Sequence, residues 1–165
     1  SKIEWIEKDR INPQYFWKGG KRGISLYRLE VEVVPADCSM IQTPYNILDN
    51  WYNPLMKSAK LNGIEVHARS VFLQGLLLMD DLPSWVNGKA RGRIKLFHYV
   101  CKKEQYEPYE AALGWVLGLE EVDKVIVGVN SARQLEQLLK VSPLKWDYDF
   151  SVTDEIVLDP RKWPA

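Results

Sequence analysis

Polar and aromatic side chains gather where four short apolar runs of the sequence end. The runs cover residues 22–27, 38–45, 65–71 and 124–129. Their ends carry hydroxyl, amide, guanidinium and aromatic groups: Ser25, Tyr27, Gln42, Tyr45, Asn46, Arg69, Ser70, Phe72, Gln74 and Asn130. Such groups can donate and accept hydrogen bonds, but the set contains no pair suited to act as general acid and general base. We therefore predict no catalytic residue in this chain.

The histidines and cysteines do not supply the missing chemistry. His67 falls inside an apolar run and His98 inside a helical pattern, so we predict packed or surface side chains for both. Cys38 and Cys101 are too few and too far apart for a disulfide framework or a zinc site. The sequence predicts two reduced packing thiols and no metal site.

Charge and composition limit the class of protein. The 22 Lys and Arg balance the 22 Asp and Glu, so no basic surface predicts nucleic-acid binding or attraction to an anionic membrane. No apolar run approaches the roughly 20 residues of a membrane span, and the start Ser1-Lys2-Ile3 does not resemble a signal peptide. With 46% hydrophobic residues, we expect one globular domain over residues 1–165, located in the cytoplasm.

Helical patterns follow the second, third and fourth runs. After the second, Asp49 or Asn50 is expected to cap a helix that continues to Leu61, and Gly63 to stop it. Strands that alternate with helices predict a parallel sheet with right-handed crossovers.

Three further helices are expected. One covers residues 93–105, and one begins at Pro108, which suits the first turn of a helix. The third begins at the caps Asn130 and Ser131 and places three leucines on one face: Leu135, Leu138 and Leu139.

Three segments lie outside this alternation. Residues 3–11 form a helical pattern followed by the aromatic cluster of residues 15–17. Residues 72–91 contain several glycines and a proline, and a connection of this length predicts a functional loop or lid. Residues 151–165 are expected to wrap the outside as irregular structure.

Three stretches of the sequence, each of which overlaps one of the apolar runs, together resemble the later strands of an aldo-keto reductase barrel. They are MIQTPYNILD at 40–49, GIEVHARSVFLQGLL at 63–77 and KVIVGVNSARQLEQL at 124–138. The variant GISLY at 23–27 with YNILD at 45–49, together with the late DPRKW at 159–163, is most similar to bacterial members associated with surface-sugar biosynthesis. The resemblance implies a partial TIM-type (β/α) barrel, in effect its C-terminal half, with about four parallel strands. A complete barrel needs about 250 residues, more than the 165 present.

The resemblance also implies an NADP site. It places Ser25 and Gln42 at the nicotinamide carboxamide. Four residues fall on the pyrophosphate loop: Ser70, Phe72, Gln74 and Gly75. Four more fall near the adenosine: Asn130, Ser131, Gln134 and Gln137. Three positions depart from the family pattern and weaken the implied cofactor site: Leu26, Arg69 and Leu138.

The family's Asp, Tyr, Lys and His belong to the first half of the barrel, and no segment before Lys21 matches them. We therefore expect a cofactor-binding half of a reductase for a carbonyl or sugar-derived substrate. Four open strands would expose a curved apolar face and two edges, so we expect a homo-oligomer or a complementary half-barrel chain. The alternatives are a non-catalytic ligand-binding or interaction module derived from the barrel, and an unrelated small α/β domain.

Overall fold

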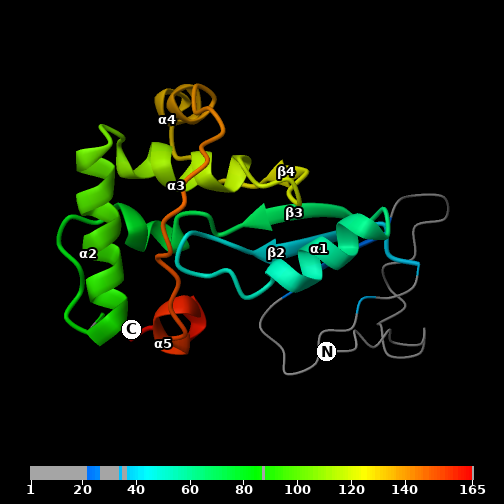
Figure 1. The fold of residues 1–165 in the computed structure, drawn as a ribbon, viewed down its shortest axis with the longest axis horizontal. Coiled ribbons are helices and arrows are strands. Elements are labelled where there is room, and N and C mark those ends of the chain that lie inside the picture. The colour runs from blue at the N-terminus through cyan, green and yellow to red at the C-terminus, as the bar shows by residue number, and fades with distance from the viewer. Residues whose placement is uncertain (1–21, 27–33, 35–36, 87, 165) are drawn as a thin grey trace.

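The computed structural model of the chain describes residues 22–26, 34, 37–86 and 88–164 (Figure 1). The helix expected at residues 3–11, the aromatic cluster at 15–17 and the strand end at Tyr27 lie outside the described residues.

Four parallel strands form one sheet, as the alternation of strands and helices predicts. The strands are β1 (Gly23–Ser25), β2 (Met40–Pro44), β3 (Glu65–Arg69) and β4 (Lys124–Val125). They lie in chain order, and every neighbouring pair is parallel. All four are shorter than the apolar runs, most of all β4, which ends after two residues.

The two faces of this sheet differ in chemistry. On one face, Ile41, Thr43, Val66 and Ala68 are fully buried under helices. On the other, strand register aligns Ser25 with Gln42, Gln42 with His67 and His67 with Lys124. The expectation of a curved apolar face is therefore wrong, because alternate strand residues on the open side are polar and only partly buried.

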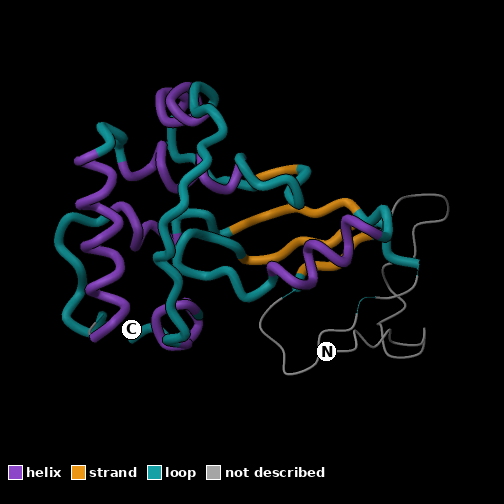
Figure 2. The backbone as a smooth tube through the Cα atoms, viewed as in Figure 1, coloured by secondary structure: helices purple, strands orange, loops and turns teal. Residues whose placement is uncertain are grey.

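Helices follow β2, β3 and β4 (Figure 2). They are α1 (Asn53–Leu61), α2 (Gly88–Lys103), α3 (Pro108–Leu117), α4 (Ala132–Leu138) and α5 (Glu155–Leu158), with 3₁₀ segments η3 (Leu73–Leu78) and η4 (Pro160–Lys162). In the described part of the chain, no helix is both long and apolar enough to cross a membrane.

Helix α1 begins later than expected. Its cap is Tyr52, and Pro54 occupies the first turn, so the prediction of a cap at Asp49 or Asn50 is wrong. The Asp49 carboxylate instead accepts a hydrogen bond from the Trp51 amide at 3.2 Å, which forms the turn before the helix. The expected stop is confirmed, because Gly63 adopts φ +72°, a conformation that glycine tolerates.

The starts of α3 and α4 agree with the predictions, whereas the start of α2 does not. Pro108 opens α3, and Glu107 and Glu110 form a reciprocal capping box there. Ser131 caps α4, as predicted, by accepting a hydrogen bond from the Gln134 amide. Helix α2 starts at Gly88, inside the segment expected to be a loop, because the glycines at 88 and 92 are tolerated within a sixteen-residue helix. Of the three leucines expected on one face of α4, only Leu138 is buried, and Leu135 and Leu139 are exposed.

Two hydrophobic clusters hold the chain together. The first, here called the sheet core, joins buried strand side chains to α1 and α3 through residues such as Met56 and Val116. The second, the tail core, joins η3 and α2 to the C-terminal segment. Phe150, Val152, Val157 and Leu158 of that segment are buried in the tail core, so the tail is part of the interior and contains two short helices. The prediction of an irregular outer wrap is therefore wrong.

Candidate functional site

A pocket lies at the carboxyl ends of β2 and β3. Its volume is about 210 Å³. Its lining comes from both strand ends, η3 and the tail: Pro44, Asn46, Asp49, Arg69, Ser70, Leu73, Gln74, Leu158, Asp159, Pro160 and Arg161. In Figure 1 the arrowheads of β2 and β3 point toward the side of the sheet where the tail passes on its way from α4 to α5.

The backbone of one pocket wall is strained. Ser70, Leu73 and Gln74 have φ values of +58°, +46° and +53°, and Gly75 follows at +87°. Among the described residues, Gln105 is the only other non-glycine residue with positive φ. Left-handed conformations cost free energy for residues with a Cβ and concentrate at binding and catalytic sites. The pocket wall therefore has the character of a ligand site.

Hydrogen bonds of the Asn46 side chain hold this wall in place. Its Oδ1 accepts hydrogen bonds from the amides of Leu48 (3.0 Å) and Asp49 (3.2 Å), and its Nδ2 donates to the Ser70 carbonyl at 3.3 Å. The side chain is 1% exposed. Asn46 thus ties the loop after β2 to the loop after β3. Asn46 is among the predicted strand-end residues but not among the predicted NADP contacts, and its local sequence signal is an Asx turn.

Arg69 spans the strand ends. Its guanidinium donates to the Leu26 carbonyl at 2.9 Å and to Ser70 Oγ at 3.2 Å. In the family this position commonly carries an aromatic ring for stacking. Here a guanidinium takes its place, a planar cation that can pair with oxyanions and can also stack on a flat ring.

The carboxamide pair predicted from the sequence is hydrogen-bonded. Ser25 Oγ donates to Gln42 Oε1 at 3.0 Å, and parallel register places the two residues side by side. The next position, Leu26, is 3% exposed and packs in the sheet core, so it offers no polar group to a ligand.

The predicted pyrophosphate residues fall into two groups. Ser70 and Gln74 line the pocket. Phe72 is half-buried and packs against both cores, whereas Gly75 continues the left-handed turn, and neither lines the pocket.

The predicted adenosine residues form a separate cluster at the start of α4. The Asn130 amide donates to Gln134 Oε1 at 2.9 Å, and Ser131 caps the helix. Gln137 is exposed on the same helix, and Leu138 is buried in the sheet core. None of these residues lines the pocket.

Tyr45 lies at the end of the β2 run, and it is unsuited to proton donation. It is 2% exposed and stacks on Trp115 with centroids 5.7 Å apart. Burial, and then the charges of Glu121 and Asp49, raise the pKa of its hydroxyl. Proton donation to a carbonyl requires a lowered pKa instead.

The remaining reactive side chains have local partners. His67 Nε2 lies 2.8 Å from Glu65 Oε1, and His98 Nε2 lies 2.8 Å from the Leu77 carbonyl. Cys38 and Cys101 are buried thiols, and burial raises the pKa of Cys101 to about 12. No group of three potential metal ligands occurs among the residues that the structure describes.

Comparison with known proteins assigns the family. A family model described as the aldo/keto reductase family matches residues 27–157. The chain belongs to this family. It is 25% identical over 146 residues to L-galactose dehydrogenase of Arabidopsis thaliana, an alignment that covers 82% of this chain and 44% of that protein.

Solved aldo-keto reductases share its fold. The apo form of aldo-keto reductase AKR11C1 from Bacillus halodurans superposes with a TM-score of 0.56 at 24% identity, over 66% of this chain and 40% of that one. The holo form gives a TM-score of 0.53 at 22% identity, over 66% and 38%. This aldo-keto reductase chain thus spans less than half the length of these relatives, and its four parallel strands correspond to part of a TIM barrel.

Proposed function

We propose that this chain supplies the cofactor-binding half of an NAD(P)H-dependent oxidoreductase that reduces carbonyl groups. Family membership supports the reaction class. The observation that carries the proposal is the pocket at the carboxyl ends of β2 and β3, where Ser70, Leu73 and Gln74 all adopt left-handed backbone conformations. Ligand sites of barrels lie at this end of the strands.

The residues present fit part of such a cofactor. The Ser25 and Gln42 side chains present a hydroxyl and an amide together, which can pair with a carboxamide. Ser70 and Gln74 offer donors on the pocket wall beside Arg69, which suits a pyrophosphate. A volume of about 210 Å³ takes only one portion of a dinucleotide, so the rest of the molecule would lie along the open strand ends. NAD(P)H, when bound, supplies the hydride.

The proposal requires further protein. The polar sheet face with Ser25, Gln42 and His67 would form part of a barrel interior once more strands close it. Those strands can come from a longer polypeptide, a second copy or a complementary chain. The substrate we propose is a carbonyl compound, and the relative named L-galactose dehydrogenase favours a sugar-derived one. The buried thiols Cys38 and Cys101 suit a reducing compartment such as the cytoplasm.

Titration with NADPH and NADH tests this function. We expect either nucleotide to quench tryptophan fluorescence of the chain saturably. Ser70→Ala should weaken binding several-fold, because it removes a hydroxyl from the pocket. Ser84→Ala is the control, since Ser84 is exposed and does not line the pocket. No response at saturating nucleotide would contradict the proposal.

One observation favours a second candidate, a non-catalytic ligand-binding or interaction module derived from the barrel. Leu26 and Leu138 stand where the family commonly has polar cofactor contacts, and both are buried in the sheet core. On this reading the pocket binds a small ligand without a nucleotide. Binding of small anions or sugars, without binding of NADPH or NADH, would support this second candidate.

A further inference from the structure

The chain reverses its backbone handedness at Ser70, the first residue after β3. Strand β3 ends at Arg69, and Ser70 has φ +58°. Serine carries a Cβ, so this conformation costs free energy that a glycine would not incur. The Ser70 carbonyl accepts from the Leu73 amide at 2.9 Å, which closes a turn. A turn of this kind restricts the two residues after the carbonyl and not Ser70 itself, so contacts from outside the loop select the left-handed form.

Two consecutive residues of the loop after β2 supply those contacts. The Tyr45 amide donates to the Arg69 carbonyl at 2.9 Å, and Asn46 Nδ2 donates to the Ser70 carbonyl at 3.3 Å. These two carbonyls flank the two soft backbone torsions of Ser70. A donor that fixes the direction of each carbonyl therefore fixes the conformation of Ser70.

The Asn46 side chain is itself held in one orientation. Its Oδ1 accepts from the amides of Leu48 and Asp49 at 3.0 and 3.2 Å. Its own amide and carbonyl pair with the backbone of Asp49. Rotating the side-chain amide by 180° would turn its NH₂ group toward two N–H donors and its oxygen toward the Ser70 carbonyl. The hydrogen-bond network therefore permits only the orientation in which Nδ2 faces Ser70.

The shape of the pocket wall depends on the conformation of Ser70. Ser70 and Gln74 both line the pocket, and Leu73 between them is 1% exposed and anchored in the tail core. If Ser70 relaxed to a negative φ, the direction of the chain between β3 and Leu73 would change. The Ser70 hydroxyl and the Gln74 amide would then lose their common arrangement, and a ligand would have to restore it on binding.

We propose that Asn46 is a positioning residue for this pocket, which holds Ser70 in its left-handed conformation and so arranges the Ser70 hydroxyl and the Gln74 amide before a ligand binds. Asn46 acts through Ser70 and needs no contact with the ligand. The identity of that ligand as a nicotinamide dinucleotide rests on the proposed function.

Combined substitutions at the two positions test this role. Asn46→Ser keeps a hydroxyl that can accept hydrogen bonds within the turn but is too short to reach the Ser70 carbonyl. It is introduced into Ser70→Gly, which removes the cost of the left-handed form, and into Ser70→Ala, which keeps that cost. Both backgrounds lack the Ser70 hydroxyl, so they differ only in backbone preference. The dissociation constant for NADPH and the melting temperature are measured for every variant.

The two measurements should respond in opposite directions. In Ser70→Ala, Asn46→Ser should weaken NADPH binding about tenfold, because the wall relaxes and few chains retain the binding conformation. In Ser70→Gly the loss should be less than about threefold, because glycine populates positive φ about as readily as negative φ. The melting temperature should fall about 2–4 °C further in Ser70→Gly, because relaxation of the alanine variant recovers the cost of its left-handed form.

Gln105 provides a matched control. It is a non-glycine residue with φ +62°, it is exposed, and it does not line the pocket. Gln105→Gly therefore removes the same kind of backbone cost away from the site. Asn46→Ser should change NADPH affinity and melting temperature equally with and without Gln105→Gly.

Equal effects of Asn46→Ser in the two Ser70 backgrounds, or losses of affinity and stability that are both larger in the same background, would overturn the positioning role. If Asn46→Ser does not fold, Asn46→Asp replaces it. An aspartate keeps the acceptor in the turn and lacks the donor at neutral pH, and its charge is common to both backgrounds.

The same measurements separate the positioning role from the cofactor function. NADPH binding without the coupling between Asn46 and Ser70 supports the cofactor function and overturns the positioning role. If NADPH fails to bind the unmodified chain, the cofactor function is wrong. The melting temperatures then decide alone: the expected difference between the two backgrounds supports the hold of Asn46 on Ser70, and its absence overturns that hold.

Discussion

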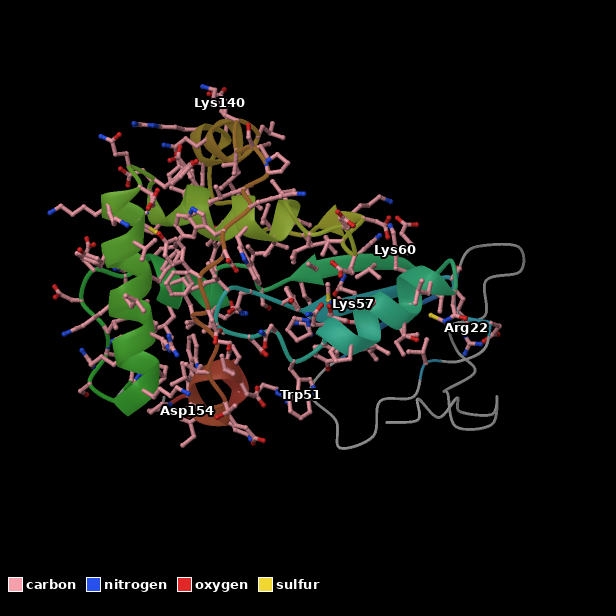
Figure 3. The ribbon with its side chains drawn as sticks, viewed as in Figure 1. Arg22, Trp51, Lys57, Lys60, Lys140 and Asp154 are labelled. Carbon is pink, nitrogen blue, oxygen red and sulfur yellow. The ribbon has the colours of Figure 1, made fainter. Side chains whose placement is uncertain are left out.

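The sheet core and the tail core are built in different ways. In the sheet core, strands of regular alternation bury every second side chain against α1 and α3. In the tail core, a segment with little regular structure packs aromatic residues against α2. Figure 3 labels Lys140, beside α4, and Asp154, beside α5, near the two ends of this segment. Phe97, Trp146 and Phe150 meet there with ring centroids 5.7 to 6.4 Å apart. The pocket lies where residues from both parts meet, so each core positions one of its walls.

The two cores also differ in the interactions that stabilise them. The central strands β2 and β3 are hydrogen-bonded through the backbone to a strand on each side. The tail is held mainly by aromatic packing. Phe72 and Trp115 pack against both clusters. We therefore expect the cores to unfold together, and the following changes test that link.

Phe150→Ala should have the largest effect. Phe150 is 1% exposed and packs edge-to-face on Phe97 at 5.7 Å. Its removal leaves a cavity, for which we expect a loss of about 3–5 kcal/mol in the free energy of unfolding. Urea denaturation followed by both circular dichroism and tryptophan fluorescence measures the loss.

Ile41→Ala is the counterpart in the sheet core. Ile41 is fully buried, and we expect a loss of about 2–4 kcal/mol. In both variants the two signals should shift together. If circular dichroism and tryptophan fluorescence instead gave separate transitions, with only the fluorescence transition shifted in Phe150→Ala, the tail core would be an independent unit.

Gly118→Ala should loosen the tail from α3. A Cβ at this position would lie 2.5 Å from the Leu144 carbonyl oxygen, so the extended segment before Trp146 must shift. We expect a loss of about 1–3 kcal/mol from overpacking. Gly92→Ala is the control, because Gly92 lies in the middle of α2 with no atom within 4 Å of the added Cβ. It should stabilise the chain by up to about 1 kcal/mol, and a similar loss in both variants would contradict the steric explanation.

Lowering the pH should give the smallest change in stability among these tests, and it should affect both cores. The pKa of Asp159 is lowered by its hydrogen bonds to Arg161. Burial acts to raise the pKa of Asp123, but hydrogen bonds from Lys60 and the Val66 amide lower it overall. A carboxyl with a lowered folded pKa stabilises the fold above its unfolded pKa of about 3.9 and loses that contribution as the pH falls through the folded value.

Melting temperature should therefore change little through these two groups from pH 7 to 5 and decline below about pH 4. Asp123→Asn and Asp159→Asn should each reduce the steepness of that decline. An unchanged acid slope in both variants would show that other carboxyl groups cause it.

Several local features could be predicted from the sequence because their causes lie within a few residues. Gly63 ends α1, Pro108 opens α3 and Ser131 caps α4. The cap of α1 was mispredicted because Asp49 and Asn50 both suited the pattern, and the Asx turn at Asn46 sets the turn that precedes the helix. Ser70 and Gln74, which the resemblance places on a pyrophosphate loop, both line the pocket.

The sequence by itself determined the parallel β/α order and the family, because hydrophobic period, turn residues and motif spacing are local properties. Only the tertiary structure decided that Asp159 and Arg161 share a pocket with Ser70. It also decided which strand face is polar and that the tail is interior. Those outcomes depend on contacts between residues tens of positions apart, and packing of the aromatic tail against α2 selects them.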